Sequence, residues 1–464
     1  MDLVTSAQTD QLLESLSFAL PPSSSYVIDR DQTSFYSGQP NLQPGAGQNV
    51  SRITLASGDS WLDMESLRLS FRVKNLSATH NLNFAGPPGT LLERWVCEIN
   101  GTVVEDINFY GRSSTLLGTL LNSSERVLHE AAESGMAYQH DRTIMTGEFE
   151  KTYSVHNFYN KVIAPQAYMD IIHRPVCGLA SCQKMLPLWA ASVTFTLYWA
   201  TPTDVVARTW QHGVASAPAA NAGSSTTYEI SNVQMLCSTV KLDSALSSSY
   251  AQILKNSQSL VWGITSIATQ QAQLTDGVTE FSISLTRAVS KLQTCFLTFT
   301  YDNATNLADV DRNRNHPMVS FANPSRVVPS GLLVGNANVL QTQAADQYDL
   351  EVSLQIGALH FPNRPISNLQ QFWYYLSEAV ETYGLTSKTI NITPERFEKQ
   401  NWVCGLNMNR VPQISSSAVS TRSGDACVFQ VKNMRPGMVN PRVFFTFLFA
   451  AYISVSERSV TLFD

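Results

Sequence analysis

Charged side chains are scarce in this chain of 464 residues. Asp, Glu, Lys and Arg together make up 15% of it, against about a quarter in typical soluble proteins. The formal net charge is −6, and no dense run of Lys and Arg occurs anywhere. Proteins that grip nucleic acid neutralise its phosphates with basic side chains, so we expect no direct sequence-specific binding of nucleic acid. A polar but weakly charged surface suits a protein that packs against copies of itself, although a low-charge secreted β-protein shares this composition.

Long apolar runs are also missing. The longest spans 443–455, is interrupted by Thr446 and Ser454, and is too short to cross a bilayer. The amino terminus lacks a positively charged region followed by a continuous apolar stretch, which is the pattern of a secretory signal peptide. The sequence therefore predicts a soluble chain without such a signal.

Cysteine and histidine lack the spacing of metal ligands. Seven Cys are scattered along the chain, and only Cys177 and Cys182 lie close together, in the sequence CGLASC. No second pair and no His-x-His motif stands nearby, and the eight His are isolated from one another. We expect no metal site and reduced thiols, as in the reducing compartment of a cell. A zinc site at the Cys177–Cys182 pair is the alternative that the sequence leaves open.

Catalytic motifs are absent as well. The chain contains no GxSxG, GxxxxGK[ST] or GxGxxG sequence. Glu148 and Glu150 lie on an expected strand, where alternate carboxylates indicate a solvated face. We therefore expect no enzymatic activity, no catalytic or cofactor-binding residues and no cofactor. Carboxylates that folding brings together, as in glycosidases, remain the alternative.

Residues 1–50 are expected to form an N-terminal arm. A short amphipathic helix is predicted after Thr9 and ends at Pro21–Pro22, and Pro, Gly, Ser and Gln follow in quantity. Its apolar positions are Leu12, Leu13, Leu16 and Leu20. Three roles fit such an arm: it clamps a neighbouring subunit, it touches an inner membrane, or it is a tethered coil.

From residue 51 the apolar residues recur with a period of two, which predicts strands with one buried face. This alternation is clear at 67–74 and at 193–199. Asn100–Gly101 separates two apolar runs and favours the type I′ turn of a β-hairpin. We assign 51–212 to a first β-sandwich, and the Ala- and Ser-rich segment 213–226 to a linker.

Residues 227–464 are assigned to a second β-sandwich. Strands are expected at 228–237, 258–267, 278–286, 292–301 and 348–356, and Asp243 is expected to cap a helix. Pro362 and Pro365 interrupt the strand at 348–356, and Ser367 with Gln370 predicts a capping box for the next helix. That helix carries one apolar stripe, at Leu369, Phe372, Trp373, Leu376, Val380 and Tyr383.

The remaining segments complete the predicted layout. Residues 443–460 are apolar at successive positions, which indicates central strands covered on both faces. The polar segments 302–345 and 108–145 are expected to be long exposed loops. Many strands, few helices and no alternation of strand and helix predict an all-β protein. We expect two consecutive eight-stranded jelly-roll sandwiches with a few short helices in the connections.

The sequence at 349–376, DLEVSLQIGALHFPNRPISNLQQFWYYL, resembles double jelly-roll major capsid proteins of eukaryotic double-stranded DNA viruses. In that family, which includes adenovirus, virophage and polinton-like virus proteins, a strand ends in an Ile-Gly-like turn, and an aromatic-Pro-x-x-Pro-Ile step leads into a helix. The segment 228–243 is similar to the strand and helix entry that open the second jelly roll there. The hairpin at 98–107 also fits.

This resemblance implies a structural role in the virion. Three copies would form a homotrimeric, pseudo-hexameric capsomer, and capsomers would tile an icosahedral shell assembled inside the host cell. Implied partners are neighbouring capsomers, penton proteins and minor or cement capsid proteins. The arm 1–50 would lie at the inner side of the shell and bridge capsomers, with contact to an inner membrane as a further role, and its deletion would leave trimers but impair shells.

Two other classes of protein remain as alternatives. A carbohydrate-binding or carbohydrate-cleaving β-sandwich protein would present an exposed aromatic platform beside paired carboxylates, together with a signal peptide. A viral spike or minor capsid protein usually has one jelly roll rather than two. A stable trimer in solution would favour the capsomer, and a monomer would favour the carbohydrate-binding protein.

Overall fold

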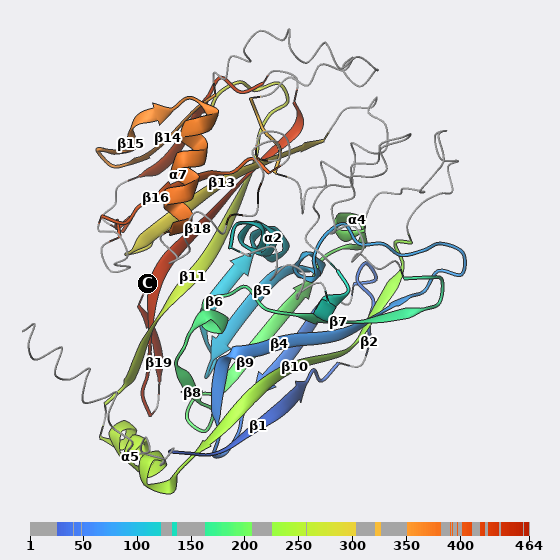
Figure 1. Cartoon of the computed structure of the whole chain (residues 1–464), viewed down its shortest axis with the longest axis vertical. Helices are drawn as coiled ribbons and strands as arrows, with labels where there is room; N and C mark the ends of the chain where they lie inside the picture. Colours follow the sequence, from blue (N-terminus) through green and yellow to red (C-terminus); the bar gives the residue numbers. More distant parts are fainter. Residues whose placement is uncertain are drawn as a thin grey trace, which may run out of the picture.

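A computed structural model gives the fold of most of the chain. It describes residues 26–39, 41–47, 49–121, 132–136, 163–206, 225–256, 258–302, 321–325, 350–381, 390, 392, 397, 401–410, 418–422, 426–435, 438–457 and 459–463. The described strands form four antiparallel sheets, and these pair into two sandwiches that lie one above the other in Figure 1.

The first sandwich contains a six-stranded and a four-stranded sheet. The main path of the larger sheet is β1 (Val27–Tyr36), β10 (Tyr228–Leu242), β4 (Trp61–Asn75) and β7 (Tyr168–His173). Two short strands extend it, β2 (Asn41–Leu42) on β10 and β8 (Met185–Pro187) on β4. The smaller sheet is β3 (Val50–Leu55), β9 (Val193–Trp199), β5 (Leu92–Ile99) and β6 (Thr102–Asn108).

The second sandwich has the same plan. One sheet follows β11 (Leu260–Gln273), β18 (Val439–Val455), β13 (Leu292–Asp302) and β16 (Cys404–Asn407), with β19 (Val460–Phe463) beside β18. The other follows β12 (Phe281–Ser284), β17 (Cys427–Lys432), β14 (Glu351–Ile356) and β15 (Leu359–Ile366). Each sandwich therefore has two main paths of four strands, which confirms the predicted pair of eight-stranded β-sandwiches.

Short helices occupy the connections. They are η1 (Pro88–Leu91), α2 (Tyr110–Leu121), η3 (Leu179–Ser181), α4 (Pro202–Val205), α5 (Ser244–Lys255) and α7 (Leu369–Glu381). The side chain of Asp243 accepts a hydrogen bond from the backbone N–H of Ala245, as expected of the residue that caps α5. Figure 1 shows α2 between the two sandwiches and α5 at the lower end of the molecule. Within the described residues, no helix is long and apolar enough to cross a membrane.

Local sequence patterns account for the clearest strands. In β4 the side chains of Leu67, Leu69, Phe71 and Val73 are buried, and the residues between them are partly exposed. Asn100 and Gly101 have φ angles of 48° and 80°, so both adopt the left-handed conformation that a type I′ hairpin turn requires. Strand β18 lies between β11 and β13 and is buried along most of its length, as its apolar sequence predicts.

Two strands lie elsewhere than the sequence indicated. Residues 27–36, assigned to the arm, form β1 in the first sandwich, and residues 228–242, expected to open the second sandwich, form β10 in the middle of the same sheet. Both are long-range pairings, because the partners of β10 in β1 and β4 lie far from it along the chain, so no local pattern reveals them. The arm 1–50 thus contributes β1 and β2 to the first sandwich, and the second unit 227–464 contributes β10.

Three local predictions also need correction. Pro362 and Pro365 do not end the strand region but lie inside β15, which is an edge strand where a missing N–H is tolerated. The capping box of α7 begins at Asn368, not Ser367: the Asn368 side chain accepts from the N–H of Gln371 at 2.8 Å, and the Gln371 side chain accepts from the N–H of Ser367 at 3.1 Å. The expected loop 108–145 includes the helix α2.

Several predictions lie wholly or largely outside the described residues. These are the helix after Thr9, Glu148 and Glu150, the linker at 213–226, the loop at 302–345 and the last turn of the apolar stripe at Tyr383. Of that stripe, Phe372, Leu376 and Val380 are buried in the second sandwich, so core packing is confirmed there.

Candidate functional site at the junction of the two sandwiches

The two sandwiches meet where two sheets end. Strand β6 is the last strand of a sheet in the first sandwich, and β11 is the last strand of a sheet in the second. Figure 1 shows these two strands running upward next to each other. The outer edge of such a strand carries backbone N–H and C=O groups that no neighbouring strand satisfies. Once the junction excludes water, these groups need other hydrogen-bond partners.

Glu105 of β6 supplies such a partner. Its side chain is 1% exposed, and its carboxylate accepts hydrogen bonds from the backbone N–H of Gly178 at 2.8 and 3.0 Å. The N–H of Ile267 in β11 donates to it at 3.4 Å, and the Ser266 hydroxyl donates at 3.3 Å. One buried carboxylate therefore ties together β6, the loop that carries Gly178 and the edge of β11.

Gly178 is required by the closeness of this contact. A Cβ atom built at Gly178 would meet the backbone carbonyl oxygen of Thr265 in β11 at a distance that real Cβ atoms do not show. The loop therefore reaches the second sandwich only because this position has no side chain.

The same loop contains Cys177 and Cys182, whose spacing had left a zinc site open. Both thiols are free and buried, and burial raises the pKa of each. In the part of the chain that the structure describes, no three His, Cys, Asp or Glu side chains gather in a way that could hold a metal ion. What this loop does in the structure is contact the second sandwich, through Gly178.

Burial also changes the acidity of Glu105. Removal from water raises the pKa of its carboxyl group from 4.5 to about 7, against the opposing effect of the hydrogen bonds from Gly178, Ile267, Leu179 and Ser266. Burial raises the pKa of the neighbouring Cys97 and Cys177 thiols well above the usual range, and the charge of Glu105 raises both further. Near neutral pH, the protonation of the junction therefore depends on Glu105.

Arg112 forms a second contact between the sandwiches. It lies on α2, is 1% exposed, and its Nη2 donates to the hydroxyl of Thr298 and to the carbonyl oxygen of Phe299, both at 3.2 Å and both in β13. Its guanidinium lies 4.4 Å from the ring centre of Phe444 and 4.7 Å from that of Phe321. Burial lowers the pKa of Arg112 to about 9, so it remains a cation at neutral pH. The aromatic faces and the carbonyl oxygen stabilise this charge.

The start of α2 is fixed from both sides. The Tyr110 hydroxyl accepts a hydrogen bond from the N–H of Val176 and lies 2.8 Å from Nε2 of His173. Burial lowers the pKa of His173 to about 3, so this ring is neutral and can accept the hydroxyl proton. On the other side, the Ser113 hydroxyl lies 2.6 Å from that of Thr269 in β11. These contacts set the direction in which α2 presents Arg112 to β13.

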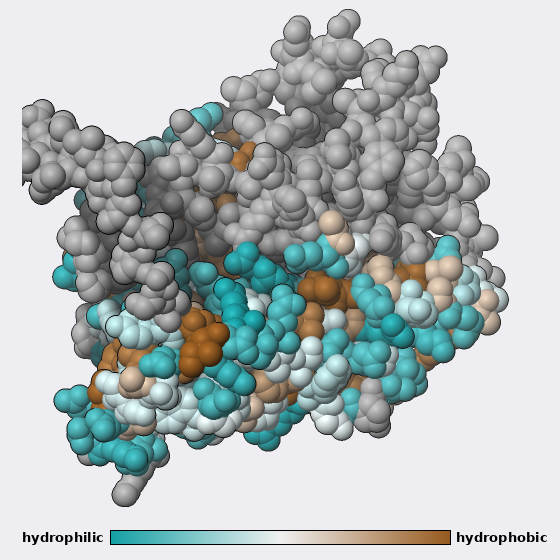
Figure 2. All heavy atoms as spheres, turned by 60° about the horizontal axis from the view of Figure 1, so that its bottom comes forward, coloured by the Kyte–Doolittle hydropathy of each residue, from teal (hydrophilic) through white to brown (hydrophobic). Residues whose placement is uncertain are grey.

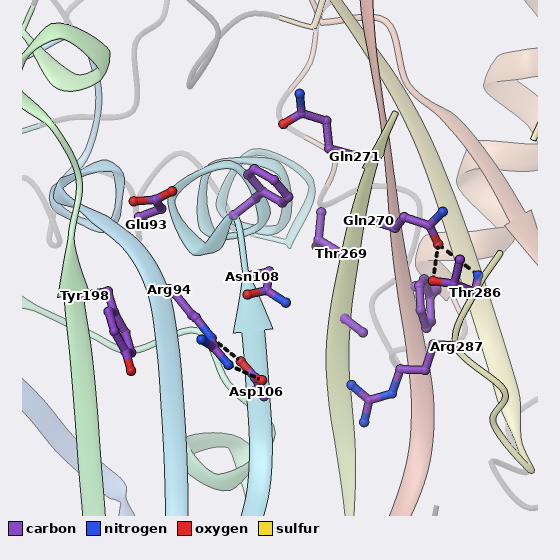
Figure 3. Close-up of a pocket in the computed structure, with 13 residues that line it drawn as sticks. Glu93, Arg94, Asp106, Asn108, Tyr198, Thr269, Gln270, Gln271, Thr286 and Arg287 are labelled. Atoms are coloured by element: carbon purple, nitrogen blue, oxygen red, sulfur yellow. Dashed lines mark hydrogen bonds and ion pairs between the residues drawn. The ribbon is translucent and has the colours of Figure 1, made fainter. Parts of the chain in front are cut away.

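Beyond Glu105 the two edges diverge around a pocket of about 670 Å³. Figure 3 shows the pocket between the end of β6 and the middle of β11. Arg94 donates two hydrogen bonds to the carboxylate of Asp106, at 2.8 and 2.7 Å, and its guanidinium lies 5.3 Å from the ring centre of Tyr198. Across the pocket, the Gln270 side chain accepts from the N–H and hydroxyl of Thr286. Much of the polar lining is therefore already hydrogen-bonded within the protein.

The pocket contains two carboxylates, which bears on the glycosidase alternative. In Figure 3, Asp106 points toward Arg94 rather than toward Glu93, and the bidentate ion pair holds it there. A pair of acids that face one substrate is therefore not formed by these two residues.

Sequence reasoning had singled out no site residues, so Glu105, Arg112 and Gly178 were missed. A weak signal was present for two of them: Glu105, with Asp106, lies between the apolar residues Val104 and Ile107, and Arg112 lies in a helix with few charged residues. Charged side chains are usually exposed to solvent, so nothing in the local sequence indicates that these two are buried. Only the apposition of the two sandwiches buries them.

Enlarging Gly178 should loosen the junction. In Gly178→Ala the new methyl group must displace the β11 backbone, and we expect a loss of about 2 kcal/mol in the free energy of unfolding. Hydrogen exchange at the Ile267 amide should become faster in the same variant. Gly58→Ala is the matched control, because a Cβ there meets nothing within 4 Å. Equal stability of the two variants would contradict this account of the contact.

The raised pKa of Glu105 predicts a pH dependence. The folded state holds the proton up to about pH 7, whereas the unfolded chain releases it near 4.5, so the free energy of unfolding should fall as the pH rises from about 4.5 to about 7. The shift corresponds to about 3 kcal/mol. Denaturant unfolding at a series of pH values should show this fall in the wild type and lose it in Glu105→Gln. Glu65→Gln, which changes an exposed carboxylate, should keep it.

Comparison with known proteins gives a fold but no sequence family. No family model matches the sequence, and no curated protein matches it. The Faustovirus major capsid protein is similar in structure, with a TM-score of 0.57 at 8% identity, over 96% of this chain and 94% of that one. A chain of the Sputnik virophage gives 0.56 at 10% identity, over 96% and 90%.

A chain of the PBCV-1 virus capsid gives a TM-score of 0.55 at 11% identity, over 96% of this chain and 99% of that one. Coverage this complete includes both sandwiches and their junction, so the likeness is not that of one sandwich alone. At these identities the likeness concerns the fold. The chain has the double jelly-roll fold of these viral capsid chains.

Proposed function

We propose that this chain is the major capsid protein of a double-stranded DNA virus, and that it self-assembles into homotrimers that tile an icosahedral shell. The observation that carries the proposal is the tandem pair of sandwiches, matched along almost the whole chain by proteins of virus capsids. The virion shell is accordingly the proposed location.

The presence of two similar sandwiches in one chain explains how three copies would form a capsomer of nearly hexagonal outline. Three copies with two sandwiches each would place six similar sandwiches around one axis, which gives a threefold particle a nearly hexagonal outline. This outline requires that the two sandwiches of one chain keep a fixed relation. The buried contacts of Glu105 and Arg112 supply this rigidity. If the sandwiches moved apart, Glu105 would lose its hydrogen bonds from β11 and Arg112 would lose its hydrogen bonds to β13.

The surface supports contacts with other copies. Large apolar side chains that are exposed in the described part of a single chain are Tyr26, Val27, Ile28, Tyr36, Val103, Tyr168, Met185, Val261, Leu359, Tyr374 and Phe463. Figure 2 shows hydrophobic residues in several separate patches among hydrophilic ones on the face that it brings forward. Small patches of this kind favour contacts that form only when many copies assemble, and the low charge of the chain limits repulsion between them.

The finer assignments remain proposals. We divide the chain into an arm at 1–50, a first jelly roll at 51–212, a linker at 213–226 and a second jelly roll at 227–464, with β1 and β10 crossing these limits to complete the first sheet. The proposed partners are neighbouring capsomers, penton proteins and minor or cement proteins. The segment before β1 is proposed to bridge capsomers at the inner side of the shell, where an inner membrane is a further possible contact.

Assembly of the purified chain tests the proposed function. Light scattering after size exclusion should give three times the chain mass, and negative-stain microscopy should show particles with a nearly hexagonal outline. The trimer should persist on dilution into the low micromolar range. A chain that stays monomeric at all concentrations, in every variant and buffer in which it folds, would refute the capsid proposal and favour a carbohydrate-binding protein.

Removal of residues 1–25 tests the role of the arm while leaving β1 in place. We expect the truncated chain to form the same trimers but few closed shells, because trimer contacts lie in the sandwiches and the arm links one capsomer to the next. Microscopy of co-expressed capsid components would count complete shells for the full and truncated chains. Normal shell numbers from the truncated chain would rule out a bridging arm.

A further inference from the structure

Strand β1 is the least covered strand of the first sandwich. Eight of its ten residues are exposed, and among its side chains Phe35 packs against the core. Tyr26, just before the strand, and Ile28 and Tyr36 within it are 65%, 69% and 68% exposed. The strands of a sandwich are normally buried on at least one face. β1 therefore differs from the other strands of its sheet, which have such cover.

What holds β1 in place is its backbone. It pairs with β10 from Val27 opposite Leu242 to Tyr36 opposite Gln234. The hydroxyl groups of Thr33 and Thr239 lie 3.0 Å apart, and Arg30 forms an ion pair with Asp63 at 2.7 Å. The side chain of Arg30 is 59% exposed in that pair, and exposed ion pairs contribute little to stability. A strand held in this way is among the first to detach.

The chain can turn between β1 and the next anchored segment. Leu42 in β2 is 3% exposed and pairs with Ile230 of β10, so β2 is fixed to the sheet. Gly38 lies between the two strands, and a Cβ built there would meet nothing within 4 Å. A pivot near Gly38 would let β1 swing away as a unit while β2 stays in place.

If β1 left, the edge of β10 would need a replacement. Met235 and Cys237 are buried under the present arrangement, and the nine residues of β10 that lie opposite β1 would lose their neighbours, alternate ones together with their backbone hydrogen bonds. The strand that fits this edge in register and side-chain order is β1 of another copy. Exchange between copies therefore preserves every hydrogen bond and places two copies side by side at the residues that a single chain leaves exposed.

We propose that β1 is exchanged between copies in the assembled particle, so that it pairs with β10 of a neighbouring chain instead of its own. This proposal rests on the proposed capsid function, since it names one contact that would hold the particle together. Exchange covers Tyr26, Ile28 and Tyr36 because the donor and acceptor chains must approach each other around the strand.

A different contact, with two β1 strands side by side at their outer edges, is disfavoured by charge in the registers centred on the charged residues. In an antiparallel pair related by a twofold axis, each residue lies opposite its own copy or an equidistant neighbour. Centring the pair on Arg30 sets Arg30 against Arg30 and Asp29 against Asp31, and centring it on Asp31 sets Asp31 against itself. Like charges directly opposite are destabilising, so these two registers are unfavourable, whereas exchange onto β10 keeps the observed register.

The register supplies the test, because Thr33 lies opposite Cys237. One chain carries Thr33→Cys together with Cys237→Ala and a small tag, and it is co-expressed with the untagged wild-type chain. The assembled particles are treated with oxidised glutathione and run on a denaturing gel. A disulfide between residue 33 of the tagged chain and Cys237 of the other can form only if β1 is exchanged.

We expect a covalent pair of twice the chain mass that contains roughly half of the tagged chains, as random co-assembly predicts for complete exchange. The single variant Thr33→Cys shows whether the two positions can be bonded at all. A matched control co-expresses a Lys74→Cys chain with a Tyr168→Cys chain, whose positions face each other across β4 and β7. This control pair should give no bond between chains, because β7, although also an edge strand, is anchored in its own chain by the buried side chains of Ile171 and His173.

The outcomes separate the two proposals. Particles that assemble and show a disulfide only within the Thr33→Cys chain would overturn strand exchange and leave the capsid function standing. A chain that forms the disulfide but never assembles would overturn the capsid function itself. Covalent pairs in the tagged mixture, absent from the control, would support exchange.

Discussion

The relative position of the two sandwiches depends on two sheet edges that meet with no water between them. Strands β6 and β11 end their sheets, and each would expose unsatisfied backbone groups to the other. The carboxylate of Glu105 resolves this at one point by accepting from the Ile267 N–H of one sandwich and the Gly178 N–H of the other. A hydrogen-bonding side chain thus does at the junction what a neighbouring strand does inside a sheet.

The cost of this solution is the burial of charge. Glu105 and Arg112 are both 1% exposed, and burial shifts the pKa of each toward its neutral form. Each remains tolerable because it makes several hydrogen bonds, and Arg112 also lies against the rings of Phe321 and Phe444. Breaking the junction would remove the hydrogen bonds that each group makes to the second sandwich, so the same feature that costs stability fixes the angle between the sandwiches. A fixed angle is what a hexagonal tile would require.

Two edge strands of the first sandwich, β6 and β1, differ in how far they are covered. At β6 the edge is sealed by a buried side chain, whereas at β1 the outer edge and most side chains remain open. The charges at Asp29, Arg30 and Asp31 disfavour self-pairing in the registers that set like charges opposite each other, whereas the same strand complements β10 of any copy. This contrast distinguishes the contact that holds one chain together from the contact that we propose to link chains.

The sequence by itself determined the features that short segments control. The alternation at 67–74, the Asn100–Gly101 turn, the Asp243 cap and the buried strand β18 follow from local periodicity and backbone preference, and from them the pair of eight-stranded sandwiches. It did not reveal that 27–36 and 228–242 complete the first sheet, nor that Glu105 and Arg112 are buried. Those facts depend on pairings between residues far apart in the chain, and a strand edge or a charged side chain has the same local sequence whether it faces water or another sandwich. Only the tertiary structure decides which of the two it meets.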